Sequence, residues 1–220
     1  LYQKPDAKTA DTKVFTFDHA FDAYGNGAKP PATQADLYNT LGRPLLNSAL
    51  EGYNVTLFAY GQTSSGKTYS VSGTRAEPGI VTRFVRELFT RCEAQRATTV
   101  CTVEVSYVEI YLEQIRDLLY PSRRKGSLRI REHPQLGPYV EDLSKTICSS
   151  AEEVESLLAQ GSAIRTACAT SMNASSSRSH ALCNITLTQQ TQVTDADGSR
   201  RASEKMSKVS LVDLAGSERS

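Results

Sequence analysis

The chain has no apolar run near the roughly 20 residues needed to cross a bilayer, and its N-terminus has no basic segment followed by a hydrophobic core. It also lacks an excess of charge, because 25 basic and 24 acidic side chains leave a formal net charge of +1. Such a chain produces no overall field that attracts nucleic acid or an anionic membrane. We therefore expect a soluble protein with no transmembrane segment and no nucleic-acid partner, in which any acidic partner meets a local patch.

The cysteines match none of the common metal or disulfide patterns. The sequence contains no Cys-x-x-Cys pair, no histidine at a zinc-binding spacing and no regular disulfide framework. The five cysteines are Cys92, Cys101, Cys148, Cys168 and Cys183. Because free cysteines are usually buried, we expect reduced, partly buried thiols and a cytosolic compartment.

What the chain does contain is enough apolar sequence, 39% of 220 residues, to build one sizeable core. Its apolar patterns predict strands over residues 14–18, 54–60, 100–111, 181–193 and 207–213. The continuous apolar run at 54–60 predicts a strand buried on both faces. The last two strands are expected to form an antiparallel pair around a turn that contains Asp197 and Gly198.

Apolar spacings near 3.6 residues predict helices over residues 37–50, 79–95 and 150–165. Pro44 is expected to break or kink the first of these helices. Ser150 and Glu153 form a capping box that marks the start of the third. Strands that alternate with helices predict a single α/β domain on a mixed sheet, without an internal repeat or a linker to a second domain.

Residues 61–68, Gly-Gln-Thr-Ser-Ser-Gly-Lys-Thr, match a phosphate-binding turn and directly follow the predicted strand 54–60. In such a turn the backbone amides surround phosphates, and the following helix presents its positive N-terminal end to the same anion. Lys67 would reach the β- and γ-phosphates, and the Thr68 hydroxyl would bind magnesium. The alternative is a plain glycine-serine turn with a solvated lysine, against which the preceding strand argues.

Two further segments have the chemistry that such a turn requires. Residues 173–180, Asn-Ala-Ser-Ser-Ser-Arg-Ser-His, offer hydroxyls and a guanidinium to a γ-phosphate, although composition alone favours a solvated serine loop or a phosphorylation site. Residues 209–218 form an apolar strand that ends at Asp213 and continues to Gly216. A P-loop enzyme places its second acidic group near magnesium here, whereas a strand-end Asp without a P-loop is most often a turn former.

Together, residues 61–68 preceded by Phe-Ala-Tyr, residues 173–180 and residues 211–218 resemble the P-loop, switch I and switch II of kinesins, in the family's order and spacing. Glu-Gly-Tyr-Asn at 51–54 and Tyr-Val-Glu-Ile-Tyr-Leu-Glu at 107–113 also match, so the resemblance covers nearly the whole chain. It implies a P-loop NTPase fold of three layers, with a central mixed sheet flanked by helices, and a partial motor domain over residues 1–220. Within the family, residues 128–143 are most similar to the kinesin-three group of vesicle transporters.

The resemblance also implies a site for ATP and Mg²⁺. The residues that would bind the nucleotide are Gly61, Gln62, Thr63, Ser64, Ser65, Gly66, Lys67, Thr68 and Tyr69, the last of them near the adenine. Thr68, Ser177 and Asp213 would hold the metal or its water. Ser177, Arg178, Gly216 and Glu218 would be the catalytic group.

Within this group, the resemblance implies that Gly216 donates its amide to the γ-phosphate. Arg178 would pair with Glu218 across the two switches, and the closed pair would position the attacking water. Ser64 stands where many kinesins have Gly or Ala, and a serine fits there only if the backbone does not need a positive φ. His180 is either a structural hydrogen-bonding residue or a catalytic one.

A kinesin-like chain implies microtubules as partners, contacted partly through residues 131–140. Arg131 and His133 are the candidate contacts. For Arg131, an ordinary exposed charge on a strand is an equally good interpretation. The basic cluster at residues 123–125 fits a solvated loop better than a binding surface. Cargo or adaptors would bind regions outside this chain.

The function implied is that of an ATP-hydrolysing microtubule motor of the cytoplasm and cytoskeleton. A non-hydrolysing microtubule-binding module is the alternative, and it is opposed by the intact Lys67, Thr68, Arg178, Asp213 and Glu218. A P-loop GTPase would need Asn-Lys-x-Asp, which the sequence lacks. Because the chain begins at Leu1 and ends at Ser220, just after switch II, we expect a fragment of a longer protein whose own folding and ATPase activity are open.

Overall fold

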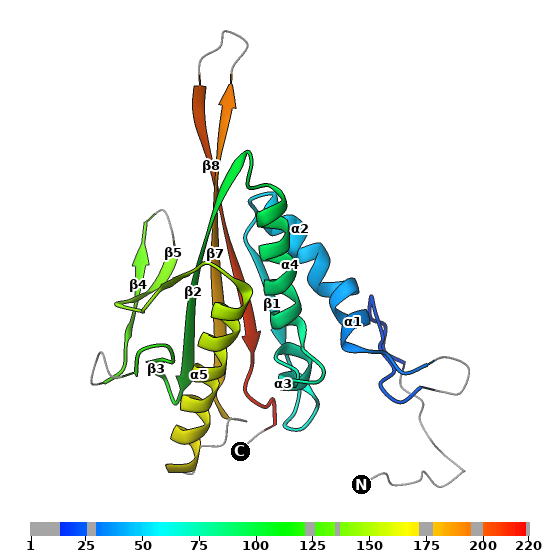
Figure 1. The fold of residues 1–220 in the computed structure, drawn as a ribbon. Coiled ribbons are helices and arrows are strands. Elements are labelled where there is room, and N and C mark those ends of the chain that lie inside the picture. The colour runs from blue at the N-terminus through cyan, green and yellow to red at the C-terminus, as the bar shows by residue number, and fades with distance from the viewer. Residues whose placement is uncertain are drawn as a thin grey trace, which may run out of the picture. The chain divides into compact units, whose positions relative to one another are not determined.

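Two long paired strands run through the middle of the main sheet in the computed structural model (Figure 1). Strands β7 (His180–Thr194) and β8 (Arg200–Asp213) are antiparallel along their length, which confirms the predicted pair. The Asp197-Gly198 turn lies outside the described residues. The structure describes residues 14–25, 30–121, 126–134, 137–171, 178–194 and 200–218.

The main sheet is mixed, as predicted. In the described ranges it has six strands, with the order β1-β8-β7-β2-β3 and with β6 paired to β2. Only β1 and β8 run parallel to each other. The remaining strands of this sheet are β1 (Val55–Ala59), β2 (Thr99–Tyr111), β3 (Gln114–Asp117) and β6 (Thr146–Cys148). A separate hairpin joins β4 (Arg129–His133) and β5 (Gly137–Glu141).

The helices confirm the predicted alternation with strands. They are α1 (Gln34–Leu37), the π-helix η1 (Tyr38–Gly42), α2 (Arg43–Leu50), α3 (Lys67–Val71), α4 (Ile80–Ala94) and α5 (Ala151–Ser171). The wide η1 turn ends at Gly42, two residues before Pro44, which has no amide hydrogen and whose ring crowds the preceding turn. The predicted disruption at Pro44 is therefore confirmed.

One hydrophobic core joins α2, α4 and α5 to a single face of the sheet (Figure 1). Alternate residues of β7 and β8 point into it, among them Ile185, Leu187 and Leu211, which are almost fully buried. On the helical side Phe84 of α4 has no exposed surface. This packing fixes the ends of β1 and β8 beside the start of α3, which is where the phosphate-binding turn lies.

Several local predictions were wrong or incomplete. Residues 14–18 form no strand: the chain divides into the units Leu1–Thr33 and Gln34–Ser220, and the described part of the first contains no strand to pair with. Strand β1 is buried on one face only, with Phe58 63% exposed, because α2 and α3 cover just that face. Helix α5 continues six residues past the predicted end at residue 165.

The capping box at the start of α5 forms with one changed hydrogen-bond partner. The Glu153 amide donates to Ser150 Oγ at 3.3 Å, as predicted. The Glu153 carboxylate instead accepts from the amide of Ser149, at 2.7 Å. The backbone hydrogen bond raises the acidity of this group, so the pKa of Glu153 is lowered from its ordinary value.

The described cysteines are free thiols, as the sequence predicted. Cys148 and Cys183 are buried, whereas Cys92 and Cys101 are half-buried; the side chain of Cys168 lies outside the described part of the chain. Burial raises the pKa of the Cys183 thiol to about 12, so this thiol stays protonated at neutral pH. No helix among the described residues is long and apolar enough to cross a membrane.

The position of Phe84 generates a stability prediction. Phe84→Ala leaves a cavity where helix α4 meets the sheet, and should lower the free energy of unfolding by about 3–5 kcal/mol. Phe58→Ala is the matched control, because its ring is 63% exposed and its loss should cost about 0.5 kcal/mol or less. Urea denaturation compares the two, and equal losses would contradict this assignment of the core.

Candidate functional site

The turn at residues 61–66 connects strand β1 to helix α3, and the side chain of Lys67 folds back over it. The Lys67 ammonium donates hydrogen bonds to the carbonyl oxygens of Gly61 and Gln62, each at 2.8 Å. The Ser65 amide donates to the Gln62 carbonyl at 3.2 Å, which closes the turn. A cation held directly over a turn of backbone amides is the arrangement that a bound phosphate chain requires.

A cavity of about 290 Å³ opens beside this turn. Its lining residues are Thr63, Ser64, Gly66, Lys67, Thr68, Tyr69, Asp213 and Leu214. The structure thus brings most of the expected nucleotide-binding residues together around one cavity, at the ends of β1 and β8. Gly66 adds the N-terminal cap of helix α3.

The two described candidates for metal binding lie against each other. The Thr68 hydroxyl donates to Asp213 Oδ2 at 2.7 Å, and Asp213 is only 5% exposed. Among the described residues, no group hydrogen-bonds to the buried Asp213 Oδ1. An open carboxylate oxygen beside a hydroxyl suits Mg²⁺ and its water ligands, so these residues fit the ion. The third candidate, Ser177, lies outside the described residues.

The protein supplies few ligands at this point. The described chain contains no group of three or more His, Cys, Asp or Glu side chains placed to hold a metal. Mg²⁺ typically keeps several waters and binds through one or two protein oxygens plus substrate phosphates. Thr68 and Asp213 supply two protein oxygens of this kind.

Sequence analysis missed the residue that holds Asp213 in place. Arg165 of helix α5 is 8% exposed, and its guanidinium lies between two buried carboxylates: 3.4 Å from Asp213 Oδ2 and 3.5 Å from Glu109 Oε1. It also donates to the Ser179 carbonyl at 2.9 Å and to the Ser179 hydroxyl at 3.2 Å. One cation thus ties α5 to strands β2 and β8 and to the residue before β7.

A signal for this cluster was present in the sequence. Glu109 interrupts the apolar strand at residues 100–111, and Arg165 falls on a helix that packs against the core. Charged residues are rarely buried unless they are paired, so two opposite charges inside apolar elements suggest partners. The sequence alone did not show that they meet.

The segment after β8 is bonded to the phosphate-binding turn and to β7. Leu214 and Ser217 donate their amides to the carbonyls of Ala59 and Gly61, at 3.3 and 3.1 Å. The Ala215 amide donates to His180 Nδ1 at 3.1 Å. Of the two roles considered for His180, the structure shows the structural one.

Glu218 contacts the phosphate-binding turn rather than Arg178. Its carboxylate accepts from the Thr63 amide at 2.8 Å and from the Thr63 hydroxyl. The hydrogen bond from this hydroxyl lowers the pKa of the Glu218 carboxyl. A side chain on Gly216 would collide with the Glu218 carboxylate and the Thr63 hydroxyl, so these two groups would have to move.

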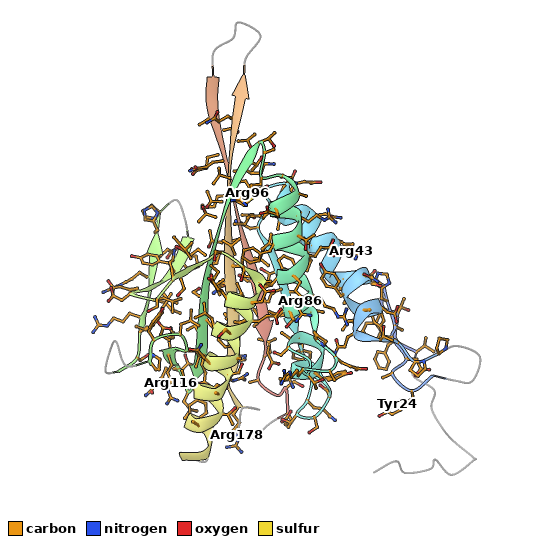
Figure 2. All side chains as sticks on the ribbon, in the orientation of Figure 1. Tyr24, Arg43, Arg86, Arg96, Arg116 and Arg178 are labelled. Atoms are coloured by element: carbon orange, nitrogen blue, oxygen red, sulfur yellow. The ribbon has the colours of Figure 1, made fainter. Side chains whose placement is uncertain are left out.

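The expected ion pair between Arg178 and Glu218 is therefore not formed in this structure. Arg178 is exposed (Figure 2), and within the described ranges it makes no salt bridge with Glu218. The physical reason is that the Glu218 carboxylate already accepts hydrogen bonds from the amide and the hydroxyl of Thr63. The Glu218 carboxylate, an anion, thus accepts a hydrogen bond from the Thr63 amide of the turn that is predicted to bind phosphate.

Ser64 does adopt the conformation that a serine was expected to avoid. Its φ is 65°, in the left-handed region where a Cβ is unfavourable. The turn therefore stores local backbone strain at an exposed residue of the cavity wall.

The hairpin of β4 and β5 carries the candidate microtubule contacts. Every residue of β4 is exposed, including Arg131 and His133. Arg131 Nε lies 3.2 Å from Glu141 Oε2, so part of its charge is already balanced within the hairpin. Residues 123–125 lie outside the described chain. The exposed charge of Arg131 is observed, while its role as a contact stays a prediction.

The backbone at Ser64 leads to a matched pair of variants. Ser64→Gly removes the left-handed penalty and should raise the free energy of unfolding by about 0.5–1 kcal/mol. Ser65→Gly, one residue later at an ordinary φ, should lower it by about 0.5–1 kcal/mol through added chain entropy. Thermal denaturation measures both, and a loss of stability in Ser64→Gly would refute the strained conformation.

Removing the Arg165 charge should have a large effect. Arg165→Met leaves the buried Asp213 carboxylate without its guanidinium partner and leaves Glu109 with the longer contact to Arg116, at 3.8 Å, at an expected cost of about 3–5 kcal/mol in the free energy of unfolding. Adding Glu109→Gln removes one of these charges, so the double variant should be more stable than Arg165→Met. Guanidinium denaturation of both variants measures this coupling.

The control is an arginine in a shorter but exposed ion pair. Arg86 forms two hydrogen bonds to Glu155, at 2.6 and 2.9 Å, and 56% of its side chain is exposed (Figure 2). Arg86→Met should cost about 1 kcal/mol or less because solvent screens the pair. If Arg165→Met cost no more than this control, the buried cluster would not have its assigned role.

Comparison with known proteins agrees with this geometry. A family model described as the kinesin motor domain matches residues 2–220. The chain is 50% identical over 214 residues to the kinesin-like protein KIF1C of Homo sapiens, with 94% of this chain and 19% of the relative covered. It is 47% identical over 209 residues to the kinesin-like protein unc-104 of Caenorhabditis elegans, with 93% and 13% covered.

Solved structures show the same fold. The structure titled as that of a fast kinesin has a TM-score of 0.82 and 39% identity, and the match covers 93% of this chain and 55% of that chain. A KIF14 dimer with AMP-PNP in complex with a microtubule has a TM-score of 0.80 and 42% identity, with 93% and 57% covered. The chain thus spans 19% or less of the two curated relatives and little more than half of each solved chain.

These matches confirm the α/β P-loop fold and the predicted similarity to the kinesin-three group. From the family model, the identities and the shared fold we conclude that the chain belongs to the kinesin motor domain family.

Proposed function

We propose that this chain is the nucleotide-binding part of a motor that binds Mg-ATP on residues 61–68 and hydrolyses it in response to microtubules. The observation that carries the proposal is the joint placement of Lys67, Thr68 and Asp213 around one cavity. Lys67 and the Thr68–Asp213 pair face the same turn, and Arg165 holds Asp213 from behind. Family membership and the AMP-PNP and microtubule in the KIF14 structure support the same reading.

In this proposal the protein mainly binds and orients. The amides of residues 63–68 and the Lys67 ammonium hold the phosphates, while Thr68, Asp213 and Ser177 hold Mg²⁺ or its water. The ion supplies positive charge that balances the phosphate oxygens. Tyr69 forms the side of the cavity where the base would stack.

The Glu218 contact suggests how a nucleotide is sensed. A terminal phosphate and the Glu218 carboxylate are both anions, and both suit the amide of Thr63. We infer that the phosphate displaces Glu218, which then pairs with Arg178, and that the Gly216 amide turns to the γ-phosphate. This pair would orient the attacking water, the step on which phosphoryl transfer chiefly depends.

The proposed partners are microtubules, contacted in part through the β4–β5 hairpin, with cargo or adaptors bound elsewhere in the longer protein. The proposed location is the cytoplasm, on the microtubule cytoskeleton. A non-hydrolysing microtubule-binding module is less well supported, because it would not need Thr68 and Arg165 both bonded to one buried carboxylate.

The proposal predicts ATP turnover that rises when microtubules are added. Thr68→Asn removes a hydroxyl that fits the metal and should lower turnover by about 100-fold or more. Glu218→Ala should slow hydrolysis by about 100-fold or more without weakening Mg-ATP binding, because Glu218 positions water and its loss frees the Thr63 amide for a phosphate. Phosphate release and equilibrium nucleotide binding measure the two effects.

A control for general damage is Glu93→Ala, an exposed change on α4, far along the chain from the P-loop, that should leave turnover unchanged. Turnover that microtubules do not raise would contradict the motor function. Mg-ATP binding with no turnover under any condition would favour the non-hydrolysing module.

A further inference from the structure

The loop between α3 and α4, residues 72–79, is closed by its own hydrogen bonds. The Thr74 amide donates to the Glu77 carbonyl at 2.9 Å, and the Glu77 amide donates to the Thr74 hydroxyl at 3.0 Å. At its base the Gly79 amide donates to the Ser72 carbonyl at 3.1 Å. These bonds use backbone groups and one hydroxyl, so the loop closes without help from the Glu77 carboxylate.

Close backbone packing makes this loop a defined structure. Gly73 has φ +71°, and a Cβ there would lie 2.8 Å from the carbonyl carbon of Pro78. Gly73 and Pro78 also form an antiparallel bridge. The loop therefore holds Glu77 in a fixed position at the surface.

From that position Glu77 contacts Tyr69, which lines the cavity beside the phosphate-binding turn. Its carboxylate accepts a hydrogen bond from the hydroxyl of Tyr69. This bond raises the pKa of the Tyr69 hydroxyl, so the group stays protonated and remains a donor at neutral pH. At the other end of Tyr69, its carbonyl accepts from Gln34 Nε2 at 2.7 Å, and Gln34 is buried. Tyr69 is thus held at its backbone and at the tip of its ring.

These contacts fix the ring of Tyr69, which lines the cavity and remains partly exposed. Tyr69 is 47% exposed and lines the same cavity as Lys67 and Thr68. An exposed aromatic ring costs less to stack on when its orientation is already set. If the phosphates of a nucleotide lie on the turn and Lys67, its base would remain within reach of Tyr69 in the same cavity.

We propose that Glu77 is a positioning residue, which holds the Tyr69 ring as the stacking surface for the nucleobase. The inference rests on the proposed ATP function, and it adds a specificity determinant from the 72–79 loop. Glu77 acts through Tyr69 and touches neither phosphate nor metal. Its loss should therefore weaken ligands that have a base and spare ligands that do not.

The test compares Mg-ATP with magnesium tripolyphosphate, which carries the phosphate chain without a base. In Glu77→Ala and in Tyr69→Phe, the Kd for Mg-ATP should rise about 5-fold, within the range that one stacking contact supplies. The Kd for tripolyphosphate should stay within about twofold of the unaltered protein. The double variant should bind no more weakly than either single variant, because both changes break the same hydrogen bond.

Two further variants separate positioning from damage. Glu77→Gln keeps an acceptor oxygen and should restore most of the affinity lost in Glu77→Ala. Glu93→Ala removes an exposed carboxylate from α4 and should change neither Kd. Because the chain contains no tryptophan, Tyr69→Trp adds a single tryptophan, whose selectively excited emission should shift when Glu77→Ala is introduced.

Each outcome is decisive. Unchanged Mg-ATP affinity in both Glu77→Ala and Tyr69→Phe would overturn the inference, and so would an equal loss of affinity for tripolyphosphate. An unaltered protein that binds neither ligand would overturn the proposed ATP function itself. Binding of tripolyphosphate with no preference for Mg-ATP would overturn base stacking alone.

Discussion

The guanidinium of Arg165 is the contact on which the site depends, because it sits between the only two buried carboxylates of the described core, Glu109 and Asp213. Without it, the acidic group beside Thr68 would be a buried and uncompensated charge. Pairs of this kind add little net stability over apolar packing, but they fix orientation. Arg165 therefore links helix α5, strands β2 and β8 and the residue before β7 to the carboxylate that fits Mg²⁺.

The rest of the site is arranged around that fixed carboxylate as a set of exchangeable contacts. Lys67 bonds carbonyls of its own turn, and Glu218 bonds the Thr63 amide. A phosphate suits the Lys67 ammonium as a partner, and it suits the Thr63 amide that Glu218 now occupies. A nucleotide would release both groups at once, so that binding at the turn reaches the segment after β8. The Tyr69–Glu77 hydrogen bond connects the 72–79 loop to the same cavity through Tyr69.

Much of this site was predictable from local sequence. Residue spacing within short segments predicts the phosphate-binding turn, helix α4, strand β2 and the β7–β8 pair. Pro44 by itself predicts the disruption of its helix. The Arg165–Glu109 contact joins residues 56 positions apart, and no local pattern encodes such a meeting. Likewise, the resemblance to kinesins implied that Glu218 pairs with Arg178, whereas in the structure Glu218 accepts from Thr63, which lies 155 positions away. The positive φ of Ser64 could not be predicted from the residue type, because serine usually adopts a negative φ.

The central claim is that a triphosphate with Mg²⁺ occupies the cavity between Lys67 and Asp213. Its most direct test is an experimental structure of the protein with Mg²⁺ and a non-hydrolysable ATP analogue. The account predicts that Lys67 leaves the carbonyls of Gly61 and Gln62 for phosphate oxygens, and that density for a metal appears beside Thr68 and Asp213. A bound analogue that leaves Lys67 on those carbonyls, or that lies away from Asp213, would contradict it.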